Sequence, residues 1–569
     1  MAFIKKEKNF INKNYVEMSV KDMAKILKTS EKEISQYLIK NNFIDKKTNP
    51  ALNEKSSIFQ DFEFKSIKDV FFDSFYFWFG IAVLIVVLFY RSYSSILLSD
   101  EMTMFNDFAS GKWVWWKMFY GSMANQYMAF VFFGLNPEGY RIFATGFHLV
   151  NIFLFFYLFR NFISEKILKI AILLISVHSL LVEPLTWVAA NPYVYHGFVY
   201  LLIMIFSLKY ERTKNFLYLS IYYLLVINFT LQGGHTNFAP LVAIAFNLFI
   251  LKRKFIDELK ISGWLLLLIP IFTFLNKNVV DSRVASLTTG PYFEKFIQTL
   301  PFTVAKSMEL VFFPYNLALF HEETLNPGYY NFARLLTLSF IILVIYLFFK
   351  KKTYFGLVAI ACGFCIYIFS PIQIAWFVAE RYMYLTTFFV CLLLAIFFNF
   401  LNKKVPNLGN ILIASYFFFF LFTTFNRFNA WANAEILWEE NIKIAPDSYR
   451  VRNNLADTYS KNGKFENASA QFSEALRINP NFVDAYFNLA NSYLTQNKFS
   501  EAENYLLISV QMNPALVESY LKLGLIKANT GNFNQAYYYI DKALEVDPNL
   551  EIAKNLKQQI KDYETKQKN

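Results

Sequence analysis

The stretch that decides the fold of the C-terminal quarter is GKFENASAQFSEALRINP, residues 463–480. Two later stretches follow the same outline: NKFSEAENYLLISVQMNP at 497–514 and GNFNQAYYYIDKALEVDP at 531–548. Each begins 34 residues after the one before it. A fixed period of this length indicates a repeated helical unit that buries its apolar face only against its neighbours.

The residue types at the repeated positions are those that a pair of packed helices needs. The equivalent positions are Pro446, Pro480, Pro514 and Pro548; Gly463, Asn497 and Gly531; Ala468, Ala502 and Ala536; Phe465, Phe499 and Phe533; and Ala456, Ala490 and Gly524. Small residues let two helices touch, and Gly or Asn at the turn tolerates a positive φ. Asp or Asn followed by Pro ends each second helix. The period matches that of the tetratricopeptide repeat.

The repeat pattern begins before the first complete copy. Ala434 and Pro446 lie one period before Ala468 and Pro480, which predicts a half repeat joined almost directly to the last apolar segment. Three full repeats follow, and a polar helix near 550–565 is expected to cap the open end. We therefore predict a tetratricopeptide-repeat domain at 429–565.

Three equivalent positions on the first helices of the repeats are candidate groove residues: Asn454, Asn488 and Lys522. Asn side chains there would bond a peptide backbone, and Lys522 would hold a carboxylate. The alternative is that all three are solvated helix positions. A partner or acceptor protein is the expected ligand of the repeats.

The segment 73–428 is far more apolar than a water-soluble domain. The chain as a whole is 55% apolar and 20% aromatic. Eleven apolar stretches follow one another, each close to the roughly 20 residues that span a bilayer as a helix. The sequence thus predicts an all-α polytopic membrane protein with about 11 transmembrane helices, followed by the repeat solenoid.

The connections between these stretches alternate between basic and nearly base-free. The basic ones are 160–169, 209–214, 252–260, 350–352 and 403–404. Short loops rich in Lys and Arg stay cytoplasmic. This predicts a cytoplasmic N-terminus and extracytoplasmic repeats, in an integral membrane protein of a bacterial cytoplasmic (inner) membrane. Pro184 and Pro270 fall in two of the stretches, and a re-entrant segment at either would move all later loops to the other side.

Residues 1–50 predict a small cytoplasmic module that is similar to a helix-turn-helix, and 51–72 read as a linker. The second helix begins Glu31-Lys32-Glu33, whereas a DNA-reading helix would be strongly basic. We expect a docking or regulatory module and no nucleic-acid partner. The net charge of +12 is attributed to the cytoplasmic loops and the N-terminal segment, where anionic lipid attracts cations.

The first outer loop carries Asp100 and Glu101 directly after the first apolar stretch. Adjacent carboxylates at the mouth of a cavity suit acid–base chemistry, although a hydrated loop with ordinary surface acids is the alternative. Glu380 and Arg381 lie on the same predicted side. Arg381 is either a bidentate phosphate clamp or one half of a buried structural pair with Glu380. No two histidines have metal-ligand spacing on one helix, so no metal site is predicted.

Five segments in order resemble the GT-C glycosyltransferases, and in particular the transmembrane and tetratricopeptide-repeat O-mannosyltransferases. They begin with Asp100-Glu101 and end with Ala379-Glu380-Arg381-Tyr-Met-Tyr384-Leu. Between them lie Phe147-His-Leu-Val-Asn151, His178-Ser-Leu-Leu-Val-Glu183-Pro-Leu-Thr-Trp187 and Leu310-Val-Phe-Phe-Pro314-Tyr-Asn-Leu. The chain departs from the family in having Ser after His178, Gly234-His235 near the sixth span, and the N-terminal module.

The resemblance implies transfer of a sugar from a polyprenyl phosphate donor to a protein hydroxyl on the extracytoplasmic face. Asp100 would be the base, with Glu101 as the second candidate, and Arg381 beside Glu380 would stabilise the leaving phosphate. His178, Glu183 and Trp187 would shape the sugar pocket. The departures leave open the sugar, a need for a divalent metal, and whether the chain is an active enzyme.

Two other functions remain open from the sequence. A non-catalytic platform would use the repeats to assemble envelope proteins, although one span would suffice as its anchor. A transporter of lipid-linked sugars would carry charges in mid-span or paired broken helices, and the apolar stretches here hold almost none.

Overall fold

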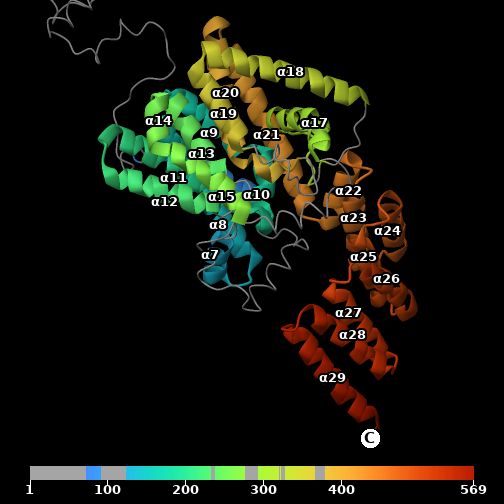
Figure 1. Ribbon diagram of the computed structural model, residues 1–569. Coiled ribbons are helices and arrows are strands. Elements are labelled where there is room, and N and C mark those ends of the chain that lie inside the picture. The colour runs from blue at the N-terminus through green and yellow to red at the C-terminus, as the bar shows by residue number, and fades with distance from the viewer. Residues whose placement is uncertain are drawn as a thin grey trace, which may run out of the picture.

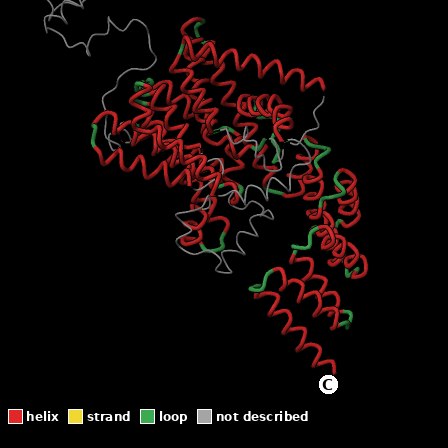
Figure 2. The backbone as a smooth tube through the Cα atoms, in the orientation of Figure 1, coloured by secondary structure: helices red, strands yellow, loops and turns green. Residues whose placement is uncertain are grey.

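The computed structural model describes residues 72, 74–90, 124–231, 238–275, 292–319, 321, 327–364 and 378–568. Every regular element within these ranges is helical, apart from one isolated bridge between His321 and Val378 (Figures 1 and 2). The all-α prediction is therefore confirmed for the described chain. The module at 1–50, the linker apart from Phe72, and Asp100 with Glu101 lie outside the described residues.

The described residues between Phe75 and Trp431 form a packed helical body. Its elements are α5 (Phe75–Phe89), α7 (Ala124–Phe133), α8 (Pro137–Phe159), α9 (Glu165–Ser176), η4 (Ser179–Leu181), α10 (Val182–Thr186), η5 (Val188–Ala190), α11 (Pro192–Thr213), α12 (Phe216–Leu231), α13 (Ala239–Ala245), η7 (Phe246–Ile250), α14 (Phe255–Ser262), η8 (Gly263–Leu267), α15 (Leu268–Leu275), α17 (Tyr292–Phe312), α18 (Pro327–Lys350), α19 (Lys352–Phe364), η9 (Glu380–Met383), α20 (Tyr384–Lys404) and α21 (Leu408–Trp431).

The number of membrane-length helices is smaller than the sequence predicts. Five described helices are long and apolar enough to cross a bilayer, or six if the bent pair α9 with η4–α10 counts as one span. Four shorter apolar helices coincide with other predicted stretches: Phe75–Phe89, Phe216–Leu231, Ala239–Ile250 and Lys352–Cys362. The expected count of eleven is thus not reached among the described residues, because several apolar stretches form helices too short for the roughly 20 residues that a span needs.

The core of the helical body is built from interlocking aromatic rings. Phe155 and Phe159 of α8 meet Phe388 and Phe389 of α20 edge-on, with ring centroids 5.4–5.5 Å apart. Edge-to-face packing of this kind adds to the gain from burial alone. In contrast, only 6% of the apolar window of α18 is buried inside the protein, and this helix lies along the top of Figure 1. A large exposed apolar surface of this kind marks an interaction or membrane-facing surface.

A bend of 59° replaces the single straight span expected near 170–188. The helix stops at Val177, whose carbonyl accepts a hydrogen bond from the Thr424 hydroxyl at 2.7 Å. The ring of His178 then contacts the carbonyl oxygen of Val311 at 3.0 Å. The Thr424 hydroxyl thus satisfies a carbonyl that the broken helix leaves unpaired, and His178 ties the bend to the end of α17. The bend turns α10 back into the protein interior, where Glu183 and Trp187 are buried.

The C-terminal region is a solenoid of paired helices at the lower right of Figure 1. Its elements are α22 (Ala434–Ile444), α23 (Tyr449–Lys461), α24 (Phe465–Ile478), α25 (Val483–Thr495), α26 (Phe499–Met512), α27 (Val517–Asn529), α28 (Phe533–Val546) and α29 (Glu551–Lys568). The small repeated residues are buried as predicted. A Cβ at Gly524 would lie 2.7 Å from the Cδ1 of Ile540, which explains why the smallest residue occupies that position.

The turn residues of the repeats adopt the left-handed conformation that the sequence predicts. Gly463, Asn497 and Gly531 have φ values of 76°, 60° and 77°. Only glycine reaches this region without a steric penalty, and Asn tolerates it better than most residues.

Replacing Gly531 by Ala is expected to destabilise the α27–α28 pair by about 1 kcal/mol, because the Cβ is strained at positive φ. No atom lies within 4 Å of that Cβ, so the effect reports backbone conformation alone. Amide hydrogen exchange measured by mass spectrometry should accelerate about fivefold around this turn. The exposed Asn534→Ala change should leave exchange unaltered, and equal rates in both variants would contradict the assignment of strain.

Candidate functional site

Two buried ion pairs bring together residues from three distant parts of the chain. The Nη1 of Arg381 lies 2.6 Å from Oε1 of Glu183, and the Nη2 of Arg427 lies 3.1 Å from Oε1 of Glu380. Arg381 and Glu380 are in η9, Glu183 is in α10 and Arg427 is in α21. None of these four side chains is more than 5% exposed.

Aromatic rings flank the arginines. The Arg381 guanidinium lies 4.8 Å from the ring centroid of Trp187 and 5.1 Å from that of Tyr382. Arg427 lies 6.0 Å from the ring of Trp431, and the two indoles are 6.5 Å apart. A cation over an aromatic face is stabilised, and more so when water is excluded. We call this set, with Glu183 and Glu380, the ion-pair cluster.

The pairing differs from the buried Glu380–Arg381 pair that was one sequence-based interpretation, and the phosphate clamp stays a prediction. The adjacent residues Glu380 and Arg381 do not pair with each other in the contacts described; each takes its partner from another helix. The guanidinium expected to clamp a phosphate is already engaged by Glu183. An incoming anion would have to share Arg381 with Glu183 or displace it.

Several polar atoms of the ion-pair cluster are buried without a hydrogen-bond partner among the residues that the structure describes. They are the Oε2 atoms of Glu183 and Glu380, the Nε1 atoms of Trp187 and Trp431, and the Nε of Arg427. Leaving such groups unpaired costs about 1–3 kcal/mol each. A molecule with hydroxyl groups satisfies both kinds, because it donates to the carboxylates and accepts from the indoles. The cluster therefore has the donors and acceptors of a polar ligand site.

His178 lies at the bend between α9 and η4. Its Nε2 is 3.0 Å from the Val311 carbonyl oxygen, and its Nδ1 accepts the backbone N–H of Leu180 at 3.3 Å. The ring centroid is 4.2 Å from that of Phe420. Both ring nitrogens are thus engaged in holding the bend, and the sugar-pocket role of His178 stays a prediction.

A second buried group joins two of the segments that carry the family resemblance. The Tyr384 hydroxyl lies 2.8 Å from Nδ1 of His148, and the Nδ2 of Asn151 donates to it at 3.0 Å. A Cβ at Gly197 would lie 2.8 Å from the Tyr384 ring, so glycine is needed for this approach. Residues 147–151 and 379–385 therefore pack against each other.

Sequence reasoning missed Arg427 and Trp431, which complete the ion-pair cluster. The available signal was a charged residue within a long apolar helix, since such a residue is usually paired or functional. His321 places its Nε2 at 3.8 Å from Oε1 of Glu380. No group of three or more potential metal ligands occurs among the described residues.

The predicted groove residues line hollows of the solenoid. Asn454 and Asn488 border a hollow of about 430 Å³ with Asp457, Asn491 and Thr495. Lys522 borders a second hollow of about 530 Å³, whose lining also includes apolar residues of α27 and α29. The three residues thus border hollows between first helices of the repeats, and their binding of a peptide stays a prediction.

The side-chain amides of Asn454 and Asn488 already take part in hydrogen bonds within the solenoid. The Nδ2 of Asn488 donates to Oδ1 of Asn453 at 3.2 Å, and the Nδ2 of Asn453 lies 3.3 Å from Oδ1 of Asn454. Lys522 is half-buried with its Nζ 5.7 Å from the Phe487 ring centroid, and desolvation by burial lowers its pKa. A carboxylate beside Lys522 would oppose this lowering of the pKa, because it favours the charged form.

Family comparison agrees with the repeat geometry. The "TPR repeat" family matches residues 456–497, and the "Tetratricopeptide repeat" family matches residues 483–516 and 517–550. The C-terminal region consists of tetratricopeptide repeats. These matches cover only this part of the chain, and repeats of this kind generally mediate contacts between proteins.

Solved structures give weaker likenesses. A crystal structure of MamA is 18% identical, covering 27% of this chain and 87% of MamA, with a TM-score of 0.19. The APC/C hetero-tetramer Cut9-Hcn1 is 14% identical over 75% of this chain and 76% of that chain, with a TM-score of 0.23. Such low scores add nothing to the repeat assignment. No curated protein matches the chain significantly.

Replacing Arg427 by Gln should destabilise the protein by about 3–5 kcal/mol, because it leaves the buried Glu380 carboxylate uncompensated. Adding Glu380→Gln to the same chain should recover most of this loss. The midpoint of thermal unfolding in detergent measures both, with Lys350→Gln at the exposed end of α18 as a neutral control. A double variant no more stable than Arg427→Gln alone would show that pairing is not the cause.

Proposed function

We propose that the chain is a membrane glycosyltransferase of the GT-C type that moves a sugar from a polyprenyl phosphate to a protein hydroxyl, with the repeats holding the acceptor. One observation carries the proposal. Residues that the resemblance names meet in one buried cluster. They are Glu183 and Trp187 from one segment and Glu380 with Arg381 from another about 200 positions later in the sequence. Burying four charges has a high desolvation cost, which a membrane anchor alone does not require.

The position of the solenoid supports this function. Arg427 of the ion-pair cluster also donates from Nη1 to the Leu317 carbonyl at 3.0 Å. Two residues later, the Leu319 N–H donates to the Asn441 side chain of α22 at 2.6 Å. The first solenoid helix is thus seated on the segment that Arg427 holds. A protein in the groove would be kept near the cluster, which raises its local concentration.

The proposed chemistry assigns a role to each group. Asp100, or Glu101 beside it, takes the proton of an acceptor Ser or Thr hydroxyl. The freed oxygen attacks the anomeric carbon, a new C–O bond forms, and the bond to the lipid phosphate breaks with inversion. Arg381 shifts from Glu183 to the departing phosphate, which gains negative charge. The unpartnered oxygens of Glu183 and Glu380 accept sugar hydroxyls.

The second candidate function is a non-catalytic envelope assembly platform. The observation that favours it is the charge balance of the ion-pair cluster, since both arginines are already neutralised by carboxylates. In that case the repeats alone would carry the function, and the buried pairs would serve only to join α10, η9 and α21.

Glycoproteomics of the cell envelope distinguishes the two functions. A deletion strain should lose a hexose from particular proteins, and the wild-type gene should restore it. Asp100→Asn together with Glu101→Gln should fail to restore it, because neither amide takes a proton from the acceptor, whereas Asp107→Asn in the same loop should succeed. A glycoproteome unchanged by deletion would favour the platform, as would full rescue by the variant with both Asp100→Asn and Glu101→Gln together with failure of a repeat deletion.

Substitutions of the groove residues test whether the repeats hold the partner protein. Asn488→Ala should weaken capture of the partner protein about fivefold, because one peptide hydrogen bond contributes about 1 kcal/mol. Lys522→Met should weaken partners with an acidic residue and leave others unchanged. Crosslinking yield in cells measures both, with Asn534→Ala on the outer helix α28 as the control. Identical yields for the groove and control variants would place the contact elsewhere.

A further inference from the structure

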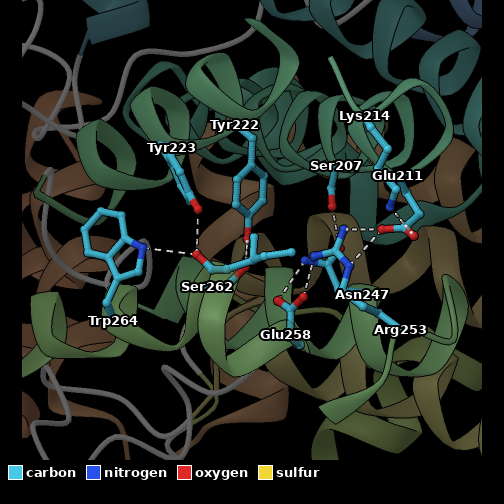
Figure 3. A network of polar contacts seen from close by, with 11 residues as sticks. Ser207, Glu211, Lys214, Tyr222, Tyr223, Asn247, Arg253, Glu258, Ser262 and Trp264 are labelled. Carbon is cyan, nitrogen blue, oxygen red and sulfur yellow. Dashed lines mark hydrogen bonds and ion pairs between the residues drawn. The ribbon is translucent and has the colours of Figure 1, made fainter. Parts of the chain in front are cut away.

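A network of polar side chains fixes the connection between η7 and α14 (Figure 3). Arg253 lies 2.8 Å from Oε2 of Glu211 through Nη2 and also pairs with the Glu258 carboxylate. The Nδ2 of Asn247 donates to Glu258 at 2.9 Å, and the Ser207 hydroxyl donates to Asn247 at 2.5 Å. We call these five residues the Arg253 network.

The carboxylates of Glu211 and Glu258 are both engaged in ion pairs of the Arg253 network. Glu258 is 1% exposed, and Glu211 is held by both Arg253 and Lys214, whose Nζ lies 2.8 Å away. The acidic groups of Glu211 and Glu258 are therefore neutralised internally. They cannot cancel the positive charges on the outer side of α14, where Asp257 is the remaining acid.

The outer side of α14 carries three exposed apolar residues as well as its charged ones. Phe255, Ile256 and Leu259 are 63%, 66% and 45% exposed. With 3.6 residues per turn, these three lie within an arc of about 100°, and the buried Glu258 lies about 60° beyond Phe255. The Arg253 network thus holds Glu258 inward, while the apolar arc stays exposed.

Three lysines border the apolar arc. Lys252, Lys254 and Lys260 are exposed, and none makes an ion pair with another residue in the described part of the chain. Lys252 has φ of 58°, a conformation that favours glycine over lysine. A lysine at this strained position suggests that its charge is of use.

We propose that Lys252, Lys254 and Lys260, together with Phe255, Ile256 and Leu259, bind the surface of a bilayer rich in anionic phospholipid. An amphipathic helix with a cationic border lies in the boundary between headgroups and acyl chains, where each cation strengthens the attraction to anionic lipid. In Figure 1, α14 and the solenoid lie at opposite ends of the molecule, so this face is far from the groove. The proposal requires a membrane and holds whether or not the chain is a glycosyltransferase.

The test uses the full chain in detergent, titrated with phosphatidylglycerol or phosphatidylcholine and followed by native mass spectrometry. The wild type should bind phosphatidylglycerol at least tenfold more tightly. The variant Lys252→Gly with Lys254→Gln and Lys260→Gln should lose most of this preference, since each lysine contributes about fivefold. Phe255→Ser with Ile256→Ser should weaken both lipids severalfold.

The controls separate lipid binding from folding and from net charge. Lys252→Gly relieves the strain of the left-handed φ. If Lys252 had only a structural role, this variant would be more stable and its lipid binding would be unchanged. Asn407→Gly relieves a similar φ, 65°, without a change of charge and should keep the preference. The solenoid variant Lys461→Gln with Lys498→Gln and Lys554→Gln removes the same charge and should keep it too. Equal binding of the two lipids by the wild type, or equal loss in the solenoid variant, overturns the proposal.

Discussion

The helical body depends on one arginine that holds three parts of the chain at once. Arg427 pairs with the buried carboxylate of Glu380 and donates to the Leu317 carbonyl, while its neighbour Trp431 packs beside Trp187. These contacts join α21 to η9, to the segment after α17, and to the bent segment that carries Glu183. Because a buried charge without a partner is costly, every member of this arrangement constrains the others.

The repeat region could be predicted from the sequence almost residue by residue. Each unit contacts mainly its neighbours, so the local pattern of small, turn and aromatic residues contains nearly all the information that the fold requires. Gly524 against Ile540 and the positive φ of Gly463 follow directly from that pattern. Long-range pairing, which a single sequence does not reveal, plays little part there.

The helical body was less predictable, because its fold depends on contacts between residues that are far apart in the sequence. Apolar composition identified the apolar helices but not their lengths, so α5 and α12 were expected to be full spans and have only 15 and 16 residues. The bend at His178 depends on Thr424 and Val311, which are far away in sequence. The sequence singled out Glu183, Glu380 and Arg381 as candidates. It did not reveal that Arg381 pairs with Glu183 and that Glu380 pairs with Arg427, because these partners lie far apart in the sequence.

The junction between body and solenoid has a mechanical consequence. Only Ala432 and Asn433 separate α21 from α22, and the Asn433 side chain caps α22 by accepting the N–H of Glu435 at 2.8 Å. The Asn441 side chain of α22 also accepts the N–H of Leu319, so a second contact limits rotation of α22 relative to α21. The solenoid acts as a rigid lever: a small tilt of α21 would sweep α29 through the widest arc, and a load on the far repeats would be felt as torque at Arg427.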